Sequence, residues 1–183
     1  MKIHRNKIIL IVFALQLLML LSVIALVYGT SARGRTVTLK LTGYDPYDAL
    51  RGRYLQMRLP DSRIPLDSGS VRRYENMAKR SIPVYVVLDR EPGTGLSYFS
   101  YASLDRPASS LPYIRCTSNY LRTYEDTSWV DIQPRINQYY LNEKHADALD
   151  RSLRRDSEIR LNLKIWRGMY VIDGIEVEGQ AYE

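Results

Sequence analysis

A long apolar segment near the N-terminus constrains this chain more than any other feature. Residues 8–28 are interrupted only by Gln16 and Ser22. As an α-helix this segment would be about 31 Å long, which is enough to cross the hydrocarbon core of a bilayer. The apolar part of a signal peptide is shorter, about 7–15 residues. We therefore expect an uncleaved single-pass anchor that contacts the lipid bilayer through residues 8–28.

The competing interpretation is a cleavable signal peptide, because the small residues Thr30, Ser31 and Ala32 follow the apolar segment. Basic residues lie on both sides of this segment, and the N-terminal amine adds a further positive charge to residues 1–7. That balance favours a cytoplasmic N-terminus. The part after the anchor is then expected to be periplasmic or otherwise extracytoplasmic, joined to the membrane by a short linker at residues 29–35.

Composition excludes several classes of site from the rest of the chain. The single cysteine, Cys116, rules out an intramolecular disulfide and a cysteine-cluster metal site. The two histidines, His4 and His145, lie on either side of the apolar segment, which excludes a multi-histidine metal centre. Acidic and basic residues are interspersed and no nucleic-acid-binding motif occurs. We therefore expect no metal, no cofactor and no nucleic acid as a partner.

Alternation of apolar and polar residues predicts a β-rich domain over residues 36–183. The clearest strand is residues 158–166, where every second residue is Ile or Leu. Asp173-Gly174 is either a tight turn or a bulge within the last strand. The turn-rich residues 91–95 predict a hairpin. Further strands are expected at residues 36–41, 55–59, 84–88, 96–104, 113–117, 128–133 and 169–177.

Helical spacing of apolar residues interrupts the strands at residues 142–156, where Asn142 is a suitable N-cap. A short second helix is expected at residues 71–80. Mainly antiparallel strands with one or two helices make an α+β domain.

No motif for nucleophilic, phosphate or metal chemistry accompanies these elements. His145 is either a general base or, far more often for such a position, a packed helix residue. Cys116 alternates with Ile114, which favours a small buried side chain over a nucleophile. We expect a protein that is not an enzyme and has no catalytic residues, and a hydrolase that uses His145 ranks well behind the other hypotheses.

The densest local motif lies at residues 44–54. Asp45-Pro46 starts a turn, and Gly52 permits a left-handed or closely packed backbone before the next strand. We favour a structural corner here. The alternative is an interaction corner formed by Asp45, Asp48, Arg51, Gly52, Arg53 and Tyr54.

At this corner the chain resembles the GDYXXLXY family of bacterial membrane-anchored proteins. The matching residues are Asp45, Pro46, Leu50, Arg51, Gly52 and Tyr54. It departs from the family pattern at Arg53, where Asp is usual, at Met57 for Leu and at Leu59 for Tyr. Residues 136–140 with Glu143, and the closing strands at residues 159–179, extend the resemblance over nearly the whole chain. The resemblance implies an extracytoplasmic domain of unknown function, often associated with a multi-span membrane protein, and supplies no catalytic residue.

Two hypotheses follow. The first is a non-enzymatic single-pass membrane protein that acts as an accessory or interaction subunit of a multi-span membrane protein. The alternative is an extracytoplasmic domain that binds cell-envelope glycan or peptide, for which Tyr and Arg side chains are well suited. A flat apolar patch near the membrane would favour the first hypothesis, and a deep aromatic-lined pocket would favour the second.

Overall fold

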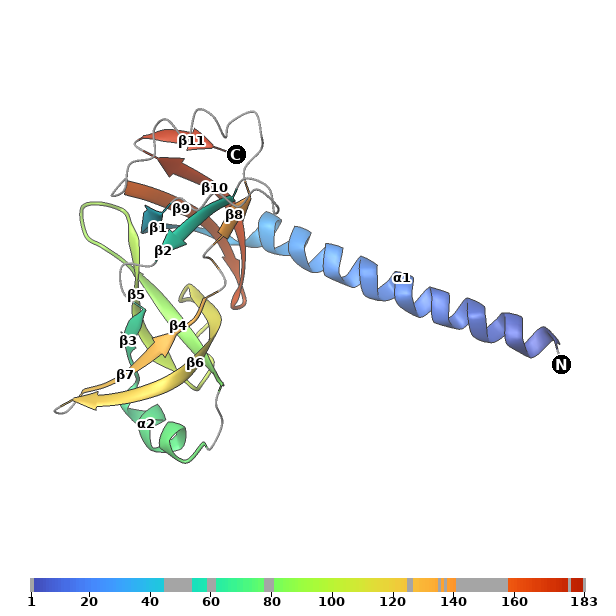
Figure 1. The fold of residues 1–183 in the computed structure, drawn as a ribbon, viewed down its shortest axis with the longest axis horizontal. Coiled ribbons are helices and arrows are strands. Elements are labelled where there is room, and N and C mark those ends of the chain that lie inside the picture. Colours follow the sequence, from blue (N-terminus) through green and yellow to red (C-terminus); the bar gives the residue numbers. More distant parts are fainter. Residues whose placement is uncertain are drawn as a thin grey trace.

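A long N-terminal helix leads into a sheet domain in the computed structural model (Figure 1). The structure describes residues 2–44, 54–58, 62–77, 81–124, 127–134, 136, 138–140, 158–177 and 179–182. Within these ranges the α+β class with an N-terminal apolar helix is confirmed. The helix expected at residues 142–156, and His145 with it, lies outside the described residues.

Helix α1 (Lys2–Arg33) contains the predicted anchor. Its residues Asn6–Arg33 are long and apolar enough to cross a membrane, with a mean hydropathy of 3.0 in the most apolar part. The large side chains of this helix are exposed on all sides, and Figure 1 shows it projecting away from the sheet domain. A helix that is apolar all round is suited to a bilayer, where lipid covers its whole surface.

Residues 29–35, where a short linker was expected, form the end of a helix and the start of a strand instead. Residues 29–33 continue α1, and strand β1 (Arg35–Tyr44) begins after a single residue, Gly34. The N–H of Gly34 donates to the carbonyl of Thr30 at 2.8 Å, which closes the last turn of the helix. Small residues usually favour a loop, but here they let the helix end pack against the sheet, where Thr30 is fully buried.

The described strands form one sheet in the order β11-β10-β9-β1-β5-β4-β6-β7-β3, with β2 paired to β1 and to β8. Every pairing is antiparallel except that of β1 with β5, which meet at Leu39 and Ser97. A short helix, α2 (Ser68–Glu75), follows β3. The strands after β1 are β2 (Tyr54–Arg58), β3 (Arg63–Pro65), β4 (Ile82–Arg90), β5 (Ser97–Ser103), β6 (Tyr113–Tyr124), β7 (Thr127–Ile132), β8 (Gln138–Tyr140), β9 (Glu158–Trp166), β10 (Met169–Val177) and β11 (Gln180–Tyr182).

Most of the strand predictions are confirmed. The hairpin across residues 91–95 joins β4 to β5, and the closing hairpin joins β9 to β10. The pairing register shifts between Ile172 and Gly174, so Asp173-Gly174 is a bulge rather than a turn. Strand β6 continues to Tyr124, beyond the predicted end at residue 117, because it pairs with β7 along this extension. Helix α2 begins and ends a few residues earlier than the expected helix at residues 71–80.

The sheet has two halves around a continuous core. Figure 1 shows β1, β2, β8, β9, β10 and β11 in one half, and β3 to β7 with α2 in the other. The first half contributes the alternating residues of β9, such as Leu161 and Leu163, and the second contributes Val84 and Val86 of β4. These residues belong to one buried cluster. The two halves therefore share their core and are held together by it.

Candidate functional site

A groove of about 680 Å³ lies between the two halves of the sheet. It lies where β5 meets β1 at one residue pair and pairs with β4 over the rest of its length. Strands β1 and β5 are paired at this one position only, and the groove lies beside it. Residues of β1, β3, β5 and β7, with the turn before β5, line the opening.

Aromatic side chains give the groove its apolar surface. Tyr98 and Phe99 come from β5, and Trp129 comes from β7. Trp129 points outward because the next residue, Val130, is buried in the core, and successive side chains of a strand face opposite ways. The exposed fraction is 49% for Tyr98 and 37% for Trp129. An apolar cavity of this size with a few polar groups is typical of a ligand site.

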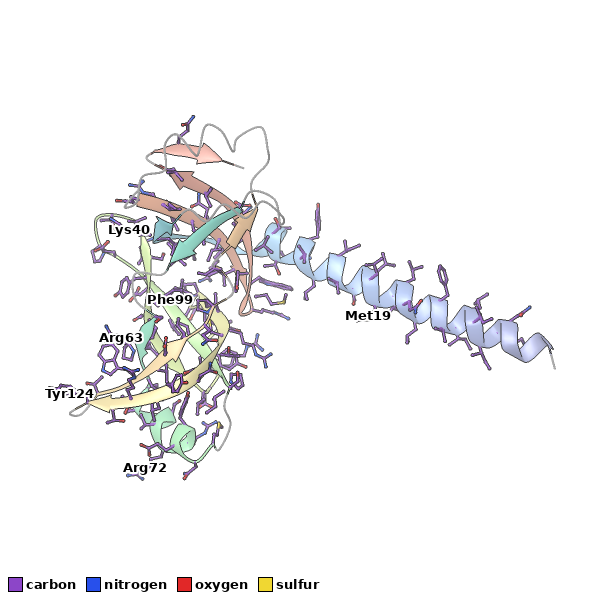
Figure 2. All side chains as sticks on the ribbon, viewed as in Figure 1. Met19, Lys40, Arg63, Arg72, Phe99 and Tyr124 are labelled. Atoms are coloured by element: carbon purple, nitrogen blue, oxygen red, sulfur yellow. The ribbon has the colours of Figure 1, made fainter. Side chains whose placement is uncertain are left out.

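Charged side chains stand along the groove. Figure 2 shows Lys40, Phe99 and Arg63 one below another between the two halves of the sheet. The ammonium of Lys40 donates to Glu158 Oε2 at 2.8 Å. This hydrogen bond holds the pKa of the Glu158 carboxyl below its ordinary value. Glu91, at the turn before β5, accepts from the Thr94 hydroxyl at 2.7 Å. The groove can therefore hold a ligand with an apolar or sugar-like body and polar ends.

The family model of the GDYXXLXY protein matches residues 16–175, which is most of the chain. The chain belongs to the GDYXXLXY family. The matched residues run from the middle of α1 into β10 and include every residue that lines the groove. No curated protein and no solved structure matches this chain.

The corner for which the GDYXXLXY family is named is only partly described. Asp45, Asp48, Arg51, Gly52 and Arg53 lie outside the described residues. Tyr54 begins β2, and its backbone pairs with that of Tyr140 in β8. An interaction role for this corner therefore stays a prediction.

Cys116 of this GDYXXLXY protein is buried on β6, as its alternation with Ile114 predicted. Burial raises the pKa of its thiol to about 12. A thiol with this pKa stays protonated at neutral pH, whereas the thiolate is the reactive form. The side chain packs in the core as a small apolar residue.

The groove was not predicted from the sequence. Its lining residues are spread from Leu39 to Trp129 and come together only when four strands take their places in the sheet. The single local signal was Trp129, a large aromatic residue that faces outward from a strand. Within the described part of the chain, no group of three or more His, Cys, Asp or Glu residues is placed to hold a metal ion.

Proposed function

We propose that this protein is a non-enzymatic, single-pass accessory subunit that binds a multi-span membrane protein on the extracytoplasmic side of the bilayer. The observation that carries the proposal is the direct junction between α1 and the sheet. Helix α1 packs on β9 and β10, and one residue separates it from β1. The domain therefore cannot move far from the bilayer in which α1 lies. A partner in the same membrane would meet both the helix and the adjoining face of the domain.

The polar residues of α1 support contact with another helix. Ser22 donates its hydroxyl to the carbonyl of Met19 at 2.7 Å, so its hydrogen-bonding need is met within α1. The longer amide of Gln16 has donors and acceptors that lipid cannot satisfy, and such groups commonly hydrogen-bond across helix interfaces. Gln16 is therefore the position in α1 at which a partner helix would be recognised.

Copurification tests the proposal. We expect the tagged full-length chain, purified in mild detergent, to retain a multi-span membrane protein that mass spectrometry identifies. Gln16→Leu should lower the recovery of that protein about threefold or more, because an interhelical hydrogen bond is worth about 0.6–2 kcal/mol. Ser22→Leu is the matched control and should leave the recovery unchanged. A chain that purifies alone contradicts the partner, and equal losses in the two variants contradict the role of Gln16.

The groove favours a second function, which is binding of cell-envelope glycan or peptide. Its volume of about 680 Å³ lies within the range of ligand sites. The rings of Phe99 and Trp129 offer flat apolar faces to a sugar, and charged side chains stand along the groove beside them. This combination suits a polymer of sugars and peptides.

A sedimentation experiment with isolated peptidoglycan sacculi tests this second function. We expect the full-length protein to pellet with the sacculi, and Trp129→Ala to lower the affinity, measured from the bound fraction at increasing amounts of sacculi, about fivefold, because one aromatic stacking contact contributes about 1 kcal/mol. Tyr124→Ala is the control, since Tyr124 is 74% exposed at the tip of β6 and lies outside the groove (Figure 2). Wild-type protein that stays in solution, or an equal loss in both variants, would count against the groove.

A further inference from the structure

A second cavity, of about 510 Å³, lies where α1 joins the sheet. We call it the junction pocket and define it by Arg33, Arg35, Arg106, Tyr113, Trp166 and Arg167. These residues come from the end of α1, the start of β1, the segment between β5 and β6, the start of β6, and the β9–β10 turn. Figure 1 shows this turn beside the C-terminal end of α1.

The junction pocket concentrates positive charge. Four of the residues that line it are arginines, and no described residue that lines it is acidic. Asp105 is next to Arg106 in sequence, but its carboxylate accepts two hydrogen bonds from Arg73, at 2.8 and 2.9 Å. A cavity lined by charges of one sign attracts ions of the opposite sign. The positive charge of the pocket therefore favours binding of an anion.

Contacts with the protein hold three of the four guanidinium groups in place. Arg106 Nε donates to the hydroxyl of Tyr113 at 2.7 Å. Arg35 donates to the carbonyl of Ser110. The guanidinium of Arg167 lies over the ring of Trp166, 5.0 Å from its centre. A guanidinium has five N–H donors, so each of these groups keeps donors for a ligand. Pre-positioned arginines lose less conformational entropy when they bind.

The position of the junction pocket along α1 matches the depth of lipid phosphates. Arg33 lies five residues after Tyr28, which is about 7.5 Å along the helix axis. The headgroup layer extends about 5–8 Å beyond each face of the hydrocarbon core. Tyr28 is 75% exposed, and a side chain at Gly29 would contact Trp166 at 3.8 Å. Tyr and Trp gather at this level of a membrane.

We infer that the junction pocket binds the phosphate of an anionic lipid headgroup. Arginine binds phosphate through paired, charge-assisted hydrogen bonds. A free phosphate ion has the same chemistry, but a pocket placed at headgroup depth meets lipid first. The inference rests on the anchoring of α1 in a bilayer and does not depend on a protein partner, so failed copurification would leave it standing.

Fluorescence of Trp166 in the full-length protein tests the inference. The chain has two tryptophans, so Trp129→Phe leaves Trp166 as the single reporter. In a neutral detergent we expect dioctanoyl phosphatidylglycerol to give a saturable change, with an affinity at least tenfold higher than that of dioctanoyl phosphatidylcholine or inorganic phosphate. Equal affinities for the two lipids would overturn the requirement for an anion. Equal affinity for inorganic phosphate would overturn the assignment to lipid.

Charge removal makes the test specific to the pocket. In the same background, Arg33→Gln with Arg167→Asn should weaken phosphatidylglycerol binding at least tenfold. Asn suits position 167 because the backbone there has a φ of 53°. Arg72→Gln with Arg122→Gln is the matched control, since it removes the same charge from the far half of the sheet, where Figure 2 shows Arg72 on α2.

The comparison uses the midpoint of each titration, because Arg167 touches the reporter ring and its removal changes the amplitude. An equal loss of affinity in the control pair would show non-specific attraction and overturn the pocket. Circular dichroism checks that each variant is folded. If the Arg33 and Arg167 pair does not fold, Arg33→Gln alone carries the comparison with Arg72→Gln, and a loss below threefold contradicts the inference.

Discussion

Replacing Gly34 with Ala is expected to lower the free energy of unfolding of the sheet domain by about 3 kcal/mol, a large effect for an overpacked site. A Cβ at this position would overlap the carbonyl oxygen of Thr30 and lie 3.0 Å from Lys164 Cβ and 3.1 Å from the backbone nitrogen of Ile165. Two of these three neighbours are backbone atoms, so the strain cannot be relieved by turning a side chain. The helix end and β9 would have to separate.

Urea unfolding of the full-length protein in detergent, followed by tryptophan fluorescence, measures this effect. Gly29→Ala is the matched control, five residues earlier and near the end of α1. A Cβ there meets Trp166 at an ordinary 3.8 Å, and Ala is favoured over Gly in a helix by about 1 kcal/mol. We therefore expect the control to be neutral or slightly stabilised. A Gly34→Ala protein as stable as the control would show that the junction is not closely packed.

Gly168→Ala is expected to cost about 2–3 kcal/mol, from two sources that add. The backbone at Gly168 has a φ of 84°, which disfavours any residue with a Cβ. That Cβ would also lie 2.8 Å from Cε2 of the Tyr113 ring. The carbonyl of Gly168 accepts from the N–H of Arg115 at 2.9 Å, so this turn joins the two halves of the sheet.

Gly93→Ala separates the backbone cost of the Gly168→Ala substitution from the cost of its collision with Tyr113. Gly93 has a φ of 95°, but no atom lies within 4 Å of the position a Cβ would take. It should therefore show the backbone cost of about 1–2 kcal/mol alone. The difference between the two variants in the same unfolding experiment measures the collision with Tyr113. Equal losses would mean that the ring moves aside at no cost.

Local patterns were sufficient to predict most of the secondary structure. In β9, a side chain at every second position is apolar, and Ile159, Leu161 and Leu163 are all buried. This period follows from the geometry of one strand and needs no knowledge of its neighbours. The bulge at Asp173-Gly174 was left open, because only pairing with β9 shows that a residue is extra.

The junction shows where local patterns fail. Gly29, Thr30 and Gly34 are typical of a linker when considered alone. They continue the helix and close it because small side chains let α1 approach Trp166 and Ile165. The stabilising contact comes from residues more than a hundred positions later in the chain. Tertiary packing therefore outweighed the low helix propensity of these residues.

The sequence by itself determined the apolar helix, the strands and the membership of the GDYXXLXY family, because helix length, side-chain alternation and a short motif are properties of neighbouring residues. The groove and the junction pocket were decided only by tertiary structure. Arg33 and Arg35 are near the membrane segment in sequence, but Arg106 and Arg167 reach it through separate loops. A site made of distant residues depends on strand order and pairing, which no local pattern encodes.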